Sequence, residues 1–383
     1  MLLEEAKKWI GIREDQIWLL KAALFEPSEA LKYWGLWKGY WQLDDFTKED
    51  SFSSVFCYID VDSQRILPLV YRNLENTKDP FLPALRDLYR ITWMHNQKLL
   101  YRAQQIVRDC NVSKIPTMLL KGIPMSLHYY KDMGVRPMGD VDVLVRLEDV
   151  EKAVIVLAKY GNIPSSVEYQ YRHIIHAMHC YDEHGIDVDL HWQPFFFQNA
   201  NAKSIQLDSR FSVLYQLLDT QTNIFSPPMQ LFHTVIHGTM GGVPVLRWIT
   251  DAAYICKSVD TAENIKEFMN LSKEFNLDYA VRLCMEYLHE EFGILSEEAY
   301  QEIQKISENR KQKEFLLLSL NYSSNFVHRL WRLIVRQSIA YDLFYEYRQK
   351  QSKVRWIFDK ILYKTIYELK FYTVKEIFLR ISK

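Results

Sequence analysis

The chain has 383 residues, of which 48% are hydrophobic and 14% aromatic, with a formal net charge of -1. This composition excludes an intrinsically disordered chain, and the five scattered cysteines without a C-x-x-C pair predict neither a disulfide framework nor a zinc site. The acidic N-terminus does not match a signal peptide and no apolar run approaches the roughly 20 residues of a membrane span, so we expect a cytoplasmic protein without a transmembrane segment.

Residues 1–113 are predicted to form a helical N-terminal region. Apolar side chains recur at helical spacing over 4–25 and 60–74, and a long amphipathic helix is predicted over 85–110. No group of side chains with evident chemistry occurs here. We expect this region to cover a face of a central sheet.

The central region, 114–200, opens with an apolar strand over 115–120. A Lys121-Gly122 turn follows, and Pro124 marks the start of a helix, because proline is tolerated in the first helical turn. A helix that leaves a glycine turn presents free N–H groups and the positive end of its dipole. This arrangement suits a phosphate.

A second strand, 140–145, alternates polar and apolar residues. Because residues i and i+2 of a strand face the same side, Asp140 and Asp142 converge while Val141 and Val143 enter the core. Neighbouring carboxylates repel each other unless a cation lies between them, and Mg²⁺ is held by one or two carboxylates together with substrate phosphates. The stretch therefore predicts a metal–phosphate site.

A third carboxylate is available on a later strand. An amphipathic helix is predicted over 147–160, and then a hairpin with strands at 171–181 and 186–192. Asp187, Asp189 and His191 share one face of the second strand. On spacing alone, either aspartate could complete the acid pair.

Residues 201–383 are predicted to form a helical C-terminal region, with helices from residue 211 onward. His233 and His237 lie four residues apart on one helix, and a second helix begins at Arg247 and includes Asp251. We interpret His237, Arg247 and Asp251 as candidate site-lining groups, with an internal salt bridge as the alternative.

The last segment is basic and aromatic. Residues 301–383 contain 17 Lys and Arg against 8 Asp and Glu. Nucleic acid, an acidic peptide or a membrane surface could be its partner, but a solvated pair of amphipathic helices is the favoured interpretation.

The order of strand, Lys-Gly turn, helix and Asp-x-Asp strand resembles the nucleotidyltransferase superfamily with the polymerase-β-like fold. Within it, MLLKG at 118–122 and RPMGDVDVLV at 136–145 resemble the motif K-G…R…D-[IV]-D-[LV]-L-V of a largely uncharacterised bacterial nucleotidyltransferase family. The family's Asp/Glu-Leu-His-Trp motif matches 189–192, which favours Asp189 as the third carboxylate. The resemblance is specific over about 118–192 and weaker elsewhere.

This resemblance implies an α+β fold, in which helical N- and C-terminal regions flank a small mixed β-sheet. It also implies transfer of a nucleoside monophosphate from an NTP such as ATP to a hydroxyl or phosphate of a small molecule, peptide or protein. Mg²⁺ or Mn²⁺ would be held by the three catalytic acids, Asp140, Asp142 and Asp189.

The expected nucleotide-binding residues are Lys121, Gly122, Arg136 and Ser126, and His191 is a further site-lining candidate. The sequence departs from the superfamily at one point. The usual Gly-Gly or Gly-Ser turn is replaced by Gly122 followed by Ile123 and Pro124. Triphosphate binding would then depend more on Lys121, or the donor would differ.

Two alternatives remain. A glycosyltransferase could use the Asp-x-Asp pair to bind the metal of a nucleotide sugar, but such folds place several βα units before that motif, whereas this chain has a helical arm. A non-catalytic binding module, such as one side of a toxin–antitoxin pair, is the non-enzymatic alternative, and the presence of all three acids argues against it. Nucleic acid is not the favoured partner.

Overall fold

The computed structural model describes residues 2–43, 59–165, 168, 175–182, 185–195, 209–240, 246–259, 261–320, 326–344 and 352–363. Within them, a mixed sheet has the strand order β3-β4-β5-β2-β1-β7-β6. Its strands are β1 (Met118–Leu119), β2 (Asp140–Leu144), β3 (Ile163–Pro164), β4 (Ala177–Tyr181), β5 (Asp187–His191), β6 (Ser212–Leu217) and β7 (Thr220–Phe225). The pairs β2–β5 and β1–β7 are parallel, and the remaining neighbours are antiparallel.

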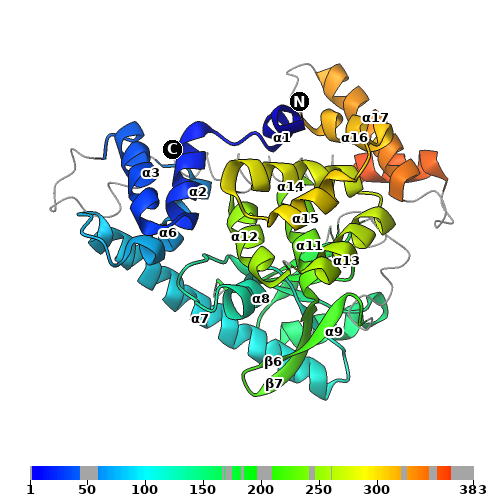
Figure 1. Ribbon diagram of the computed structural model, residues 1–383. Coiled ribbons are helices and arrows are strands. Elements are labelled where there is room, and N and C mark those ends of the chain that lie inside the picture. Colours follow the sequence, from blue (N-terminus) through cyan, green and yellow to red (C-terminus); the bar gives the residue numbers. More distant parts are fainter. Residues whose placement is uncertain are drawn as a thin grey trace, which may run out of the picture.

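Helices precede and follow the sheet along the chain (Figure 1). Those before it are α1 (Leu2–Ile10), α2 (Glu14–Leu24), α3 (Pro27–Tyr40), α5 (Val61–Gln64), α6 (Leu67–Leu74) and α7 (Leu82–Val112). Within the sheet region lie α8 (Gly122–Pro124), a π-helical turn (Met125–Tyr129), a 3₁₀ turn (Leu147–Asp149) and α9 (Val150–Ala158). Those after it are α11 (Pro227–Met240), α12 (Arg247–Val259), α13 (Ala262–Glu274), α14 (Asp278–Phe292), α15 (Glu297–Gln304), α16 (Arg310–Leu320) and α17 (Phe326–Phe344).

One face of the sheet is covered by α7 and α9. Val141 and Val143 of β2 pack in one buried cluster with Leu99 and Ile106 of α7 and with Val156 of α9. Side chains alternate along a strand, so the acidic residues between these valines face the opposite side. The acids therefore lie on the side of the sheet away from α7.

A second and larger core joins the N-terminal helices to the helices after the sheet. It includes Trp34 and Trp37 of α3, whose rings stack with centroids 5.1 Å apart, together with apolar residues of α11 to α15. The helix α7 connects the two cores, running from the N-terminal helices to the β6–β7 hairpin (Figure 1). The N-terminal helix α1 is joined to this core, because Tyr279 of α14 donates a 3.0 Å hydrogen bond to Glu5 of α1.

The predicted fold class is confirmed, since a mixed sheet lies between helical flanks. The helix prediction from residue 211 is wrong over 212–225, where β6 and β7 form a hairpin that extends the sheet. The hairpin turns at Leu218, which has a φ of +52°, and lacks the glycine or asparagine that usually marks such a turn. The sheet therefore extends beyond residue 200.

Smaller differences concern element ends. The strand predicted over 115–120 is reduced to β1, and the helix after it begins at Gly122 rather than at Pro124. The predicted hairpin is present as β4 and β5, but its residues 171–174 and the turn residues 183–184 lie outside the described residues. The core assignment of Val141 and Val143 is confirmed.

In the part of the chain that the structure describes, no helix is both long and apolar enough to cross a membrane. Cys110, Cys180, Cys256 and Cys284 are buried and no disulfide joins any two of them, and the fifth cysteine, Cys57, is not among the described residues. Of the basic aromatic segment, 321–325, 345–351 and 364–383 likewise fall outside the description, while 353–363 is helical and buries Trp356.

Candidate metal and nucleotide site

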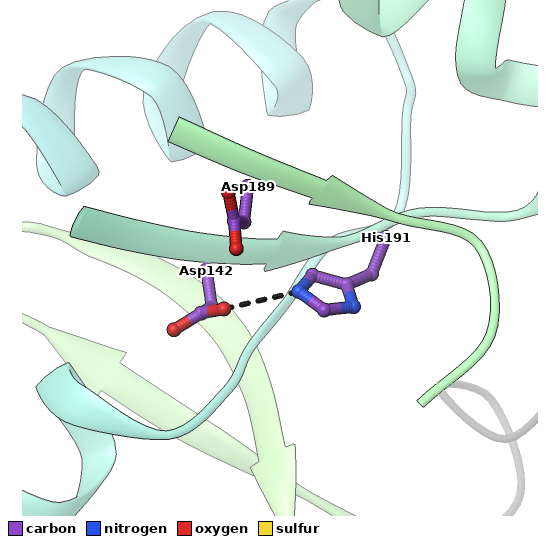
Figure 2. Close-up of side chains that lie close together, drawn as sticks. All are labelled: Asp142, Asp189 and His191. Carbon is purple, nitrogen blue, oxygen red and sulfur yellow. Dashed lines mark hydrogen bonds and ion pairs between the residues drawn. The ribbon is translucent and has the colours of Figure 1, made fainter. Parts of the chain in front are cut away.

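Two aspartates and a histidine meet where β2 and β5 run side by side. The parallel register pairs Asp142 with Asp189, and Leu144 with His191. One donor atom from each of Asp142, Asp189 and His191 lies within 4.8 Å of the others, and all three side chains are buried (Figure 2). The predicted acid of β2 and the acid favoured on β5 are thus neighbours on one sheet face.

The Asp142 carboxylate already has two partners within the protein. Its Oδ1 accepts a 2.6 Å hydrogen bond from Lys121 Nζ and lies 3.0 Å from His191 Nε2. Burial by itself raises the pKa of Asp142, but the Lys121 ammonium and the His191 ring hold this pKa well below its usual range. Asp142 is therefore an ionised oxygen donor at neutral pH.

Lys121 reaches Asp142 from a strained position in the backbone. It has a φ of +50° between β1 and α8, a conformation that residues other than glycine rarely adopt. At the next residue, a Cβ on Gly122 would lie 2.5 Å from Met138 Sδ, so the glycine allows the Met138 side chain to cover the turn. The Lys-Gly turn thus brings a cation to the acids.

The Asp189 carboxylate has a partner that the sequence analysis did not assign. The antiparallel register of β4 and β5 places His179 opposite Asp189, and their side chains form an ion pair. The hydrogen bond to Asp189 raises the pKa of His179 to about 9, although burial opposes the change. The register of the predicted hairpin would have revealed this pair.

Asp187, the competing third carboxylate, is used differently. Its Oδ1 accepts a 3.1 Å hydrogen bond from the backbone N–H of Asp182, near the turn of the hairpin. It lies opposite Asp140 in the strand register and is not part of the Asp142, Asp189 and His191 cluster.

Asp140 lies at the start of β2, half-buried and next to the cluster. Burial, followed by the charges of Asp142 and Asp189, raises the pKa of Asp140 to about 7. This accumulation of negative charge is what a bound cation relieves. The carboxylate oxygens of these residues are the donors that Mg²⁺ and Mn²⁺ prefer, so the residues fit such an ion.

A small open cavity of about 100 Å³ adjoins Asp140 and Asp142 and is bounded by α11 and α12 on its other side. The predicted site residues that line it are Lys121, Gly122, Arg136, Asp140, Asp142, His237, Arg247 and Asp251. Gln230, His233, Thr234 and Trp248, which were not predicted, line it as well.

Arg136 and Asp251 form a buried ion pair in the cavity wall. The Nε and Nη2 of Arg136 each donate a 2.8 Å hydrogen bond to the Asp251 carboxylate, which also accepts one of 2.9 Å from Tyr130 Oη. The positive charge of Arg136 is thereby compensated within the protein. The salt-bridge alternative therefore holds for Asp251, with Arg136 as its partner.

Ser126 does not line the cavity. Its side chain is fully buried, and its hydroxyl lies 3.9 Å from Met138 Sδ. His237 lines the cavity beside His233, with ring centroids 5.5 Å apart. Burial lowers the pKa of His233 to about 3, so this ring is neutral at pH 7. The His237 side chain is exposed, and partial desolvation together with the charge of Lys121 lowers its pKa.

Comparison with known proteins gave one family match. The family model described as "Uncharacterised nucleotidyltransferase" matches residues 60–293. Among solved structures, the chain resembles an antigenic nucleotidyltransferase-like protein from Paracoccidioides brasiliensis, with 15% sequence identity and a TM-score of 0.28, covering 51% of this chain and 92% of that one. The comparison with curated proteins found no match.

Proposed function

Because the chain belongs to the family of uncharacterised nucleotidyltransferases, we propose that it transfers a nucleoside monophosphate from an NTP to an acceptor and releases pyrophosphate. The observation that carries this proposal is the strand register that places Asp142, which lines a cavity, opposite Asp189. The acceptor group would be a hydroxyl or a phosphate of a small molecule, peptide or protein. We keep the expectation of a cytoplasmic protein.

Asp140, Asp142 and Asp189 would hold Mg²⁺ or Mn²⁺. When bound, the metal would supply positive charge next to the nucleotide phosphates and the acceptor oxygen. His191 would orient the Asp142 carboxylate, because its Nε2 lies 3.0 Å from Oδ1. Asp189 would accept the proton that leaves an attacking hydroxyl, with His179 beside it.

Lys121 would neutralise charge on the phosphates. Its Nζ is 2.6 Å from Asp142 and its side chain lines the cavity. Nucleotidyl transfer depends largely on positioning and on stabilising charge, so a fixed ammonium beside the acids suits this role. Gly122, whose Cβ position is filled by Met138, would contribute to the turn that carries Lys121.

The test is a transfer assay with α-labelled NTPs, Mg²⁺ or Mn²⁺, and fractionated acceptors. The wild-type protein is expected to release pyrophosphate and move the label to an acceptor. Asp142→Asn should abolish both, whereas the matched variant Asp187→Asn should retain them. Sugar transfer from a nucleotide sugar without pyrophosphate release from any NTP would contradict the proposal. Nucleotide binding without transfer to any acceptor would favour the non-catalytic alternative.

A further inference from the structure

Arg247, the first residue of α12, lines the cavity with a positive charge on which the charges of Asp251 and Asp62 act without forming an ion pair. Its Nη1 donates a hydrogen bond to the Pro137 carbonyl. Among the described residues it has no ion pair, and its buried Nε has no hydrogen-bond partner. The acid one turn further along α12, Asp251, is occupied by Arg136 and Tyr130.

Other unpartnered polar atoms lie on the same wall. Trp248 Nε1 and Gln230 Oε1 are buried, have no partner among the described residues, and belong to residues that line the cavity. Buried polar groups nearly always have a partner, so a cluster of unpaired ones indicates water or a ligand. Together with Arg247 Nε, the wall formed by α11 and α12 offers two N–H donors and one acceptor.

The other basic groups of the cavity are either engaged or neutral. Arg136 is compensated by Asp251, and Lys121 is hydrogen-bonded to Asp142. Burial keeps His233 uncharged at pH 7, and the pKa of the more exposed His237 is lowered by partial desolvation and by the charge of Lys121. Burial, followed by the charge of Arg136, lowers the pKa of Arg247 to about 10, which still leaves it protonated. Within the described part of the cavity wall, Arg247 is therefore a cation without a direct ion pair, and it could hold a phosphate in addition to one beside Lys121.

Building on the proposed function, we propose that Arg247, with Trp248 Nε1 beside it, binds a phosphate group of the substrate on the α11–α12 side of the cavity. A guanidinium presents a planar set of donors that matches phosphate oxygens. The Ser126 hydroxyl is turned toward Met138, so it offers no competing contact to such a group. The phosphate belongs either to the distal end of the NTP or to the acceptor.

The test is isothermal titration calorimetry with ATP, AMP and inorganic tripolyphosphate in the presence of Mg²⁺, and with glycerol phosphate after saturation with ATP. The variants are Arg247→Gln, Arg247→Lys and, as a matched control, the exposed Arg90→Gln of α7. If the phosphate is that of the nucleotide, Arg247→Gln should weaken the binding of ATP and of tripolyphosphate by about 10- to 100-fold and leave the affinity for AMP unchanged. Arg247→Lys should recover only part of the lost affinity, because lysine keeps the charge but lacks the planar set of N–H donors of a guanidinium.

If the phosphate is that of the acceptor, Arg247→Gln should bind ATP normally and lose glycerol phosphate. A folding defect in Arg247→Gln would instead lower its melting temperature and weaken the binding of all four probes. In that case the binding measured with Arg247→Lys, which retains the charge, decides whether Arg247 contacts the phosphate. The inference would be overturned if Arg247→Lys, Arg247→Gln and the wild-type protein bound the probes equally. It would also be overturned if the wild-type protein did not bind the probes. Arg247-dependent binding of tripolyphosphate without nucleotide turnover would support the phosphate site while rejecting the proposed transfer reaction.

Discussion

Asp142 of β2 lies directly opposite Asp189 of β5, and each carboxylate has a basic partner from a different element. Lys121 donates to Asp142 from the Lys-Gly turn, and His179 pairs with Asp189 from β4. Two buried acids on adjacent strands would otherwise repel each other. The protein thus holds the acids in place with its own basic groups, and a divalent cation would enter beside these pairs.

The choice between Asp189 and Asp187 leads to a kinetic prediction. Asp189→Ala should lower the turnover rate by about 100-fold or more with little change in nucleotide affinity, because a transition-state interaction is lost. Asp187→Ala should be mild, since that carboxylate is bonded to the Asp182 backbone at the hairpin turn. Rapid-quench turnover and equilibrium nucleotide binding measure the two effects. Equal losses of turnover in the two variants would refute the assignment.

The Arg136–Asp251 pair should contribute strongly to stability. Arg136→Met leaves a buried carboxylate without its cation, which should cost about 3–5 kcal/mol of unfolding free energy. Adding Asp251→Asn should restore much of this loss, because asparagine still accepts the Tyr130 hydrogen bond and is uncharged. Urea unfolding measures both variants.

The matched control for this pair is the exposed ion pair Arg310–Glu314 of α16. Arg310→Met should change the unfolding free energy by less than about 1 kcal/mol. A loss in Arg136→Met no larger than that of Arg310→Met would show that the buried pair is not a major source of stability.

His233 should make the protein sensitive to acid. Its pKa is lowered to about 3 in the folded state by burial, whereas an unfolded histidine titrates near 6.5. Below pH 6.5 the unfolded chain therefore takes up a proton that the folded chain does not, and stability falls by up to about 1.4 kcal/mol per pH unit for this group. In urea unfolding, His233→Gln should reduce the decline of the unfolding free energy between pH 6.5 and 4. An unchanged pH dependence in this variant would contradict the role given to His233.

Gly238 lets α11 pack closely against α12. A Cβ at this position would overlap Trp248, with its Cγ only 2.5 Å away. Gly238→Ala should therefore destabilise the protein by about 1–3 kcal/mol and weaken ligand binding, because Trp248 lines the cavity. Gly35→Ala in α3, where nothing lies within 4 Å, should stabilise it by up to about 1 kcal/mol. Thermal unfolding compares the two, and equal effects would contradict the packing argument.

Local pattern was sufficient to predict the inward valines of β2 and the common face of Asp189 and His191, because strand alternation depends only on neighbouring residues. The α+β class was implied by the family resemblance. The hairpin β6–β7 was missed because its turn at Leu218 lacks the usual residues for a positive φ. The positive φ at Leu218 is imposed by the surrounding sheet and not by the local preference of the turn residues.

Contacts between distant segments could not be predicted in the same way. Arg136 and Asp251 are 115 positions apart, and both were predicted to line the site without a pairing between them. The pair leaves Arg247 without a direct ion pair in the cavity wall, a distinction that appears only after α12 packs beside the Lys-Gly turn. Likewise, the contact between His179 and Asp189 depends on the register of β4 and β5.

The most direct test of the metal site is Mn²⁺ binding followed by electron paramagnetic resonance with a saturating NTP analogue. The account predicts that the wild-type protein and Asp187→Asn bind Mn²⁺, that Asp142→Asn loses this binding, and that Asp189→Asn binds fewer Mn²⁺ ions than the wild-type protein, each with the fold intact. Wild-type affinity for Mn²⁺ in Asp142→Asn, or loss of binding in Asp187→Asn alone, would contradict a metal site built on Asp142 and Asp189.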